Sequence, residues 1–238
     1  MVFDIHGYGS NSSQQLLYSK FASVADRENF IVVLPDGQGT PPHFNLAMSA
    51  PAGEGDDVVF MTDLLLKIRN EFCVDNHRIF ATGMSNGGVM TALLACRASD
   101  QFASFAAVAA VVYSPECGHG RPISYLAFKG TKDATIPYEG GVVSCCGNPV
   151  VPSSISAMEG WATRSECTIP PTESKIADDV TLLTYAGCAD GHVVAMYRVE
   201  GGGHSWPGSR ALPGLGVTTK SIDATELIWA FFNAHPLP

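Results

Sequence analysis

The sequence has little charge and no apolar run long enough to cross a membrane. Only 16% of its 238 residues are Asp, Glu, Lys or Arg, and 14 basic residues stand against 23 acidic ones. The net charge of −9 and the lack of any basic run argue against nucleic acid and anionic membrane surfaces as partners. The longest apolar stretches, such as residues 102–113, are too short for a transmembrane helix.

The sequence also lacks the cysteine patterns of a metal or redox site. Its 7 cysteines include no C-x-x-C pair, and no Cys/His spacing suits zinc, so no metal ligand is predicted. So many cysteines favour disulfides in an oxidising, extracellular compartment, with at least one thiol left free or paired elsewhere. No signal peptide is visible, because the chain opens directly on a strand-like segment. We therefore interpret it as a mature or trimmed form of a secreted protein.

Apolar residues are plentiful, at 46%, and they form short runs separated by helical patterns. The expected strands are 2–5, 30–35, 78–83, 105–112, 124–130 and 192–201, and the expected helices are 13–28, 56–72 (capped by Asp56 or Asp57), one beginning at Ser85, 154–164 and 221–235. This alternation predicts an α/β protein with a mostly parallel sheet covered by helices on both faces. Segments 36–55, 137–153 and 201–218 are expected loops. None separates compositionally distinct halves, so residues 1–238 are expected to form a single domain.

The segment GMSNG places Ser85 between two glycines, at the end of an expected strand and the start of an expected helix. A G-x-S-x-G motif in this context predicts a nucleophile elbow, in which a strained turn points the serine hydroxyl outward near the positive end of the helix. The flanking glycines avoid side-chain clashes where strand and helix cross. The alternative is a glycine-rich helix start with Ser85 as an ordinary N-cap.

A serine nucleophile needs a carboxylate and a histidine base, which follow it in the chain in that order. His204 lies in a glycine-rich loop after the last expected strand and is the predicted base, although it could simply pack on Trp206. Asp133 leaves strand 124–130 at its carboxyl end and is the predicted acid, although it could be a turn residue that binds nearby amides. The rivals that fit less well are His119, His192 and His235 for the base and Asp178, Asp179 and Asp190 for the acid.

Attack by a serine creates a negatively charged oxygen, which backbone N–H groups must stabilise. One predicted donor is the N–H of Asn86, directly after the nucleophile. The other is the N–H of Tyr8 in the segment HGYGSN, where His6 and Gly7 end a strand as the H-G motif of lipases does. The alternative for this segment is a plain β-turn.

Several segments of the chain resemble one family of enzymes. They are HGYGSN, DDVVFMTDLL, CVDNHRIFATGMSNGGVMTALLAC, GTKDATIPYEGG, GGGHSWPG and IDATELIWAFF, which run from residue 6 to nearly the end. In these segments the chain resembles secreted feruloyl esterases and polyhydroxybutyrate-depolymerase-like esterases of the α/β-hydrolase fold, of the carbohydrate esterase family 1 type. The resemblance places nucleophile, acid and base at Ser85, Asp133 and His204, in agreement with the spacing.

The chain departs from the pattern of this family in two places. Relatives carry one or two strands before the H-G strand, whereas only five residues precede His6, so the sheet is expected to lack N-terminal edge strands. In the loop 40–48, Phe44 stands where relatives often have a tryptophan before the Asn.

The expected topology suggests how the cysteines pair. Cys73 follows a helix and Cys96 ends one, so both should lie at the bottom of the sheet. The predicted pairs are Cys73–Cys96, Cys117 with either Cys145 or Cys146, and Cys167–Cys188. The alternative is buried free thiols.

The resemblance implies a serine carboxylic-ester hydrolase that needs no metal and no organic cofactor. The expected substrate is a feruloyl ester of plant cell-wall polysaccharide, with polyhydroxybutyrate or another polyester and acetylated xylan as alternatives. Aromatic residues expected to flank a phenolic acyl group are Tyr8, Phe44, Tyr138 and Trp206, although ordinary loop packing would explain them equally well. A remote alternative is a catalytically dead hydrolase fold that acts as a binding module. The sequence does not indicate an oligomeric state.

Overall fold

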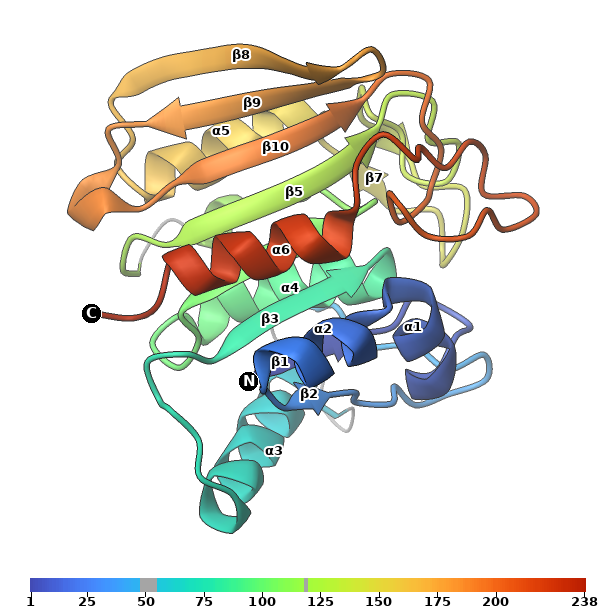
Figure 1. Cartoon of the computed structure of the whole chain (residues 1–238). Helices are drawn as coiled ribbons and strands as arrows, with labels where there is room; N and C mark the ends of the chain where they lie inside the picture. The colour runs from blue at the N-terminus through green and yellow to red at the C-terminus, as the bar shows by residue number, and fades with distance from the viewer. Residues whose placement is uncertain (48–54, 118–119) are drawn as a thin grey trace.

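The computed structural model describes residues 1–47, 55–117 and 120–238, and in this part of the chain eight strands form one twisted sheet (Figure 1). Across the sheet the strands are β2 (Val32–Val33), β1 (Val2–Ile5), β3 (Phe80–Met84), β4 (Ser104–Val108), β5 (Ser124–Gly130), β10 (Val194–Val199), β9 (Val180–Ala186) and β8 (Ile169–Ala177). The first six are mutually parallel, and β9 and β8 add an antiparallel edge. The predicted mostly parallel sheet is confirmed.

Helices cover both faces of this sheet, as predicted. Figure 1 shows α1 (Ser12–Ser19), α2 (Phe21–Glu28) and α6 (Ala224–Ala234) in front of the sheet, with α4 (Asn86–Arg97) and α5 (Ser154–Arg164) behind it. α3 (Asp57–Glu71) packs into the rear core through Val58, Met61 and Leu65. Strands β1, β3, β4 and β5 are fully buried between two layers of helices. Because both of their faces are covered, their sequences are continuous apolar runs.

The parallel strands bring the predicted site residues to one edge of the sheet. Ser85 follows β3, Asp133 follows β5 and His204 follows β10, while the H-G segment follows β1. Because parallel strands end on the same side, loops far apart in the sequence meet there. The edge strand β2, at the opposite end of the strand order from β8, has only two residues. No described strand pairs with its outer side.

Two predictions of secondary structure were wrong, and one hairpin was not predicted. The helix expected over 13–28 is two helices, because Lys20 adopts a left-handed conformation with φ 63°. The hairpin of β8 and β9 was not predicted, since β8 is an exposed edge strand whose sequence, IPPTESKIA, has no apolar pattern. The loop expected over 137–153 contains a short hairpin of β6 (Gly141–Val142) and β7 (Val150–Val151).

The cysteine pairing agrees with the prediction only in part. Cys167 and Cys188 form the expected disulfide. Cys96, however, pairs with Cys117, and Cys145 pairs with its neighbour Cys146, so Cys73 is an exposed free thiol. The predicted Cys73–Cys96 and Cys117–Cys145 or Cys117–Cys146 pairs are therefore wrong.

The reason lies in the path of the chain after β4. That segment does not stay at the carboxyl end of the sheet but returns toward the C-terminus of α4. There Arg164 donates to the carbonyl oxygens of both Cys96 and Cys117, at 3.4 and 3.1 Å. The two cysteines have a Cα–Cα distance of 5.0 Å.

Candidate functional site

Ser85 sits on a strained turn between β3 and α4. Its φ of 56° and ψ of −119° are outside the regions that non-glycine residues favour, and its N–H donates to the Val108 carbonyl oxygen at 3.0 Å. Ser85 occupies the N-cap position of α4, as the alternative expected, but its side chain makes no capping hydrogen bond to the helix, unlike an ordinary N-cap. Ser85 lines both hollows described below.

The two glycines of the motif are required by close backbone approach. A Cβ at Gly83 would lie 2.5 Å from the Gly87 carbonyl oxygen, and a Cβ at Gly87 would lie 2.1 Å from the Ile5 carbonyl oxygen. Both distances are far below van der Waals contact. Only glycine at both positions lets β1, β3 and the start of α4 pack this tightly.

Asp133 and His204 are in direct contact. His204 Nδ1 lies 2.9 Å from Asp133 Oδ2, and both residues are buried. If Nδ1 carries the proton that is shared with the carboxylate, Nε2 is unprotonated and can accept a proton from another group. His204 and Ser85 line the same hollow, of about 450 Å³, so the structure gathers the three predicted residues at one place.

The Asp133 carboxylate is surrounded by donors. The N–H groups of Thr135 and Ile136 both donate to Oδ1 at 2.9 Å, and Lys129 Nζ lies 2.6 Å from Oδ2. Burial alone would raise the pKa of Asp133, but the His204 hydrogen bond and the nearby positive charges outweigh it, and the pKa falls below the usual value. The carboxylate therefore stays ionised.

The rival residues are engaged elsewhere. Lys175 pairs with Asp178, Thr219 donates to Asp179, and Asp190 belongs to a short 3₁₀ turn before β10. His192 Nδ1 contacts the Ser124 hydroxyl at 3.0 Å, and His235 Nδ1 contacts the Phe231 carbonyl oxygen at 2.7 Å. His119 lies outside the described residues.

The H-G segment is held by the buried ring of His6. Its Nδ1 lies 2.7 Å from the Gly7 carbonyl oxygen, and its Nε2 accepts from the Gly37 N–H at 2.9 Å. This fixes the tautomer with the proton on Nδ1. A Cβ at Gly7 would lie 3.4 Å from the Ser85 Cβ, so the segment passes directly beside the nucleophile.

The two predicted oxyanion donors flank Ser85. Tyr8 and Ser85 line the same hollow. Asn86 opens α4, where backbone N–H groups have no partner within the helix. The Asn86 side chain has a separate structural role, because its Oδ1 accepts from the Phe44 N–H at 2.8 Å and its Nδ2 donates to the Phe44 carbonyl at 3.2 Å.

Ser85 also lines a second hollow, of about 350 Å³. Its lining is mostly apolar and includes Leu46, Val89, Leu93, Tyr113, Ile136, Val143 and Trp161. The lining also includes the Cys145–Cys146 pair, Val150 and Val151 of β7, and Pro152 directly after it. Ser85, the predicted nucleophile, thus borders both an apolar pocket and a more polar one.

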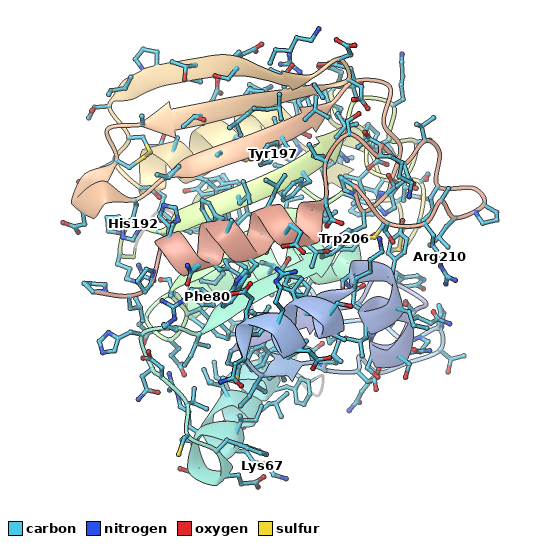
Figure 2. All side chains as sticks on the ribbon, in the orientation of Figure 1. Lys67, Phe80, His192, Tyr197, Trp206 and Arg210 are labelled. Carbon is cyan, nitrogen blue, oxygen red and sulfur yellow. A yellow bond between two sulfur atoms is a disulfide. The ribbon has the colours of Figure 1, made fainter. Side chains whose placement is uncertain are left out.

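The aromatic residues predicted to contact substrate are mostly core residues. Trp206 is 1% exposed, and its Nε1 donates to Thr225 at the start of α6, where Figure 2 shows it. Tyr138 is buried in the rear core. Phe44 is buried but borders a hollow beside Tyr8, which is 38% exposed and lines the nucleophile's hollow. The predictions for Trp206 and Tyr138 are wrong, because these side chains face inward from their loops.

Sequence reasoning missed two groups at the site. Tyr113 and Trp161 line the apolar pocket, and nothing in their local pattern distinguishes them from core aromatics. Lys129, which contacts Asp133, did leave a signal: it is a lone lysine in the buried strand SYLAFKG.

Within residues 1–47, 55–117 and 120–238, no cluster of three or more His, Cys, Asp or Glu side chains could hold a metal ion. In the same part of the chain, no helix combines the length and apolar character needed to cross a membrane.

Comparison with known proteins adds family and fold relationships. The model of the prolyl oligopeptidase family (Peptidase_S9) matches residues 16–116. In the solved structures, the chain is similar to an acetyl xylan esterase from Aspergillus awamori, with a TM-score of 0.71 and 14% identity over 98% of this chain and 88% of that one. At this identity the likeness shows a shared fold.

Two curated proteins that are similar to this chain are named as feruloyl esterases. Feruloyl esterase B of Piromyces equi is 28% identical over 212 residues, which are 86% of this chain and 39% of that protein. A probable feruloyl esterase C of Aspergillus clavatus is 38% identical over 181 residues, which are 76% of this chain and 58% of that protein. The chain thus spans between about two fifths and three fifths of the length of these relatives.

Proposed function

The chain belongs to the feruloyl esterase family within the α/β-hydrolase superfamily, and we propose that it hydrolyses hydroxycinnamoyl esters of plant cell-wall polysaccharide. The names of the curated relatives support this reaction. The apolar pocket beside Ser85 is the observation that supports a hydroxycinnamoyl acyl group.

In the proposed mechanism, Ser85 Oγ attacks the ester carbonyl carbon while His204 Nε2 accepts the hydroxyl proton. Asp133 stabilises the imidazolium through Nδ1, and the N–H groups of Asn86 and Tyr8 hold the oxyanion. The imidazolium then gives its proton to the departing sugar oxygen as the C–O bond breaks. Water, deprotonated by His204, attacks the acyl-enzyme. The bond to Ser85 Oγ then breaks, the imidazolium returns its proton to Oγ, and the acid is released.

The apolar pocket favours an aromatic acyl group over an acetyl group. Its volume of about 350 Å³ lies in the range of pockets that enclose a small organic ligand, whereas an acetyl group would leave most of it empty. The more polar hollow that Ser85 also lines, bordered by Gln14, Tyr18 and Arg210, suits the sugar (Figure 2 shows Arg210 on the loop after Trp206).

The experiment compares kcat/KM on methyl ferulate, methyl p-coumarate, acetylated xylan and a hydroxybutyrate oligomer. The proposal predicts the highest values for the two hydroxycinnamates and none for Ser85→Ala. Equal or higher values on acetylated xylan or the oligomer would contradict it. No hydrolysis by the wild-type protein, together with no labelling of Ser85 by a fluorophosphonate, would indicate a binding module instead.

A pocket variant tests where the acyl group lies. Val89→Trp would fill the apolar pocket beside Ser85, whereas Val59→Trp places the same residue at an exposed position of α3. We expect Val89→Trp to lower kcat/KM on methyl ferulate at least tenfold while leaving p-nitrophenyl acetate within a few fold, and Val59→Trp to change neither. An equal loss on both esters in Val89→Trp would contradict the placement.

We also infer that the protein acts outside the cell. Three disulfides support this, since such bonds persist in oxidising compartments. Strong reductant should lower the melting temperature, and an unchanged value would contradict a stabilising role for these bonds.

A further inference from the structure

Lys129 is a charged residue in the core, on the rear face of β5. Its side chain is 0% exposed, although lysine is almost never fully buried unless it is paired. Nζ lies 2.6 Å from Asp133 Oδ2 and 3.1 Å from the Ala109 carbonyl oxygen, and it also contacts the Ile136 carbonyl oxygen. The residue thus ties the end of β4 to the loop that carries the catalytic acid.

The three contacts of Nζ match the three hydrogens of an ammonium group. A neutral amine has only two, so one of the three oxygens would face a lone pair at hydrogen-bond distance. Burial lowers the pKa of Lys129, and the adjacent Asp133 carboxylate opposes that effect. The geometry therefore requires a buried cation beside the triad.

The same carboxylate oxygen, Asp133 Oδ2, receives both Lys129 Nζ and His204 Nδ1. A carboxylate beside a histidine stabilises its protonated form, and a second cation on that carboxylate cancels part of this effect. A histidine that is less easily protonated remains available as a base in more acidic solution.

We propose that Lys129 is a positioning residue for the Ser85–His204–Asp133 triad: its ammonium orients the Asp133 carboxylate and partly neutralises it, so that His204 works as a base at lower pH than Asp133 alone would permit. This inference rests on the proposed ester hydrolysis.

The other charged group next to Lys129 in the sheet has ion-pair partners of its own. Arg198 on β10 lies opposite Lys129 in the sheet register and pairs with Glu173 and Glu200. Burial raises the pKa of Tyr138, and the nearby Arg198 opposes that effect. Asp133 and His204 therefore remain the groups whose titration Lys129 affects directly.

The test is the pH dependence of kcat/KM on methyl ferulate, from pH 4 to pH 9, in the wild type and Lys129→Met. Methionine keeps the length of the side chain and removes its charge. We expect the midpoint of the acid limb to rise by about one pH unit, with a loss of roughly tenfold at pH 5 and a smaller loss at pH 8. Lys132→Met, which removes an exposed lysine next to Asp133, should leave the midpoint unchanged.

A merely structural role makes a different prediction. Lower activity at every pH with the same acid-limb midpoint would overturn the proposal. If methyl ferulate is not a substrate, wild type and variant are both inactive on it, and the pH dependence of Ser85 labelling by a fluorophosphonate gives the same midpoint independently.

A second measurement covers the case in which Lys129→Met does not fold. Nitrogen-15 NMR of Nζ in the unsubstituted protein distinguishes an ammonium from a neutral amine. We expect an ammonium signal for Lys129 throughout the pH range of activity. A neutral amine at pH 8 would overturn the proposal.

Discussion

Asp4 and Asp133 are both buried carboxylates, but their surroundings have opposite effects. Asp4 lies on β1 beneath α1, where it is 0% exposed, and its oxygens accept from Gln15 Nε2 at 2.7 Å and Ser19 Oγ at 2.5 Å. Both donors are neutral. Burial outweighs their hydrogen bonds and raises the pKa of Asp4 to about 7.

Asp133 is also buried but receives four donors, of which Lys129 is a cation and His204 would become one in the proposed reaction. Its pKa lies below the usual value. Four donors, two of them from groups that can carry positive charge, thus offset burial at Asp133, whereas two neutral donors do not offset it at Asp4. Only the ionised one can support a catalytic imidazolium.

The largest expected effect is a difference in kcat between substitutions of Asp133 and of Asp4. Asp133→Asn should lower kcat by about 10⁴-fold, because an amide cannot hold His204 in the required tautomer or stabilise its cation. Asp4→Asn replaces an equally buried carboxylate and should leave kcat within a few fold. Steady-state kinetics on methyl ferulate provide the measurement. Comparable losses in both variants would refute the distinction.

The next effect concerns stability against pH. Because the pKa of Asp4 is raised in the folded state, this state binds more protons than the unfolded chain between pH 4 and 7, and stability falls as pH rises through that window. Asp4→Asn removes this term. Relative to the wild type, the variant should gain on the order of 3 kcal/mol in unfolding free energy between pH 4 and pH 8.

Urea unfolding at the two pH values measures this gain. Activity is not needed as a readout, so the test is independent of the proposed substrate. A constant difference between wild type and Asp4→Asn at both pH values would mean that Asp4 titrates normally.

The smallest effect concerns one neutral donor. Ser19→Ala removes a hydrogen bond to Asp4, at a cost of about 1–2 kcal/mol. The loss should be larger at pH 8 than at pH 5, because hydrogen bonds to a charged carboxylate are stronger than bonds to a neutral acid. Ser23→Ala, at an exposed position of α2, is the matched control. An equal loss at both pH values would argue that Asp4 does not ionise in this range.

Much of the fold could be predicted because its strands are buried on both faces. Strand β5 and helix α5 begin and end at the residues that their patterns predicted. β8 could not be found in this way, since its stability comes from backbone pairing with β9 and its side chains face solvent. The split at Lys20 depends on a single left-handed residue, which the helical pattern does not exclude.

The residues of the candidate site also fall into a group that the sequence predicts and a group that it does not. The placement of Ser85, Asp133 and His204 at one edge of the sheet could be predicted, because each follows a parallel strand and such strands end on the same side. The pocket walls could not, since Tyr113 and Trp161 reach the site from segments whose course depends on tertiary packing. Trp206 was assigned to the substrate because it neighbours His204 in sequence, yet its indole points into the front core.

The central claim is that Ser85 carries the acyl group during turnover. Intact-protein mass spectrometry after acid quenching of the enzyme with a feruloyl ester tests it, followed by peptide mapping. We expect an adduct of one feruloyl group on the peptide that contains Ser85, and no adduct in Ser85→Ala. Turnover of the ester by Ser85→Ala at the wild-type rate, or an adduct on another residue, would contradict the account.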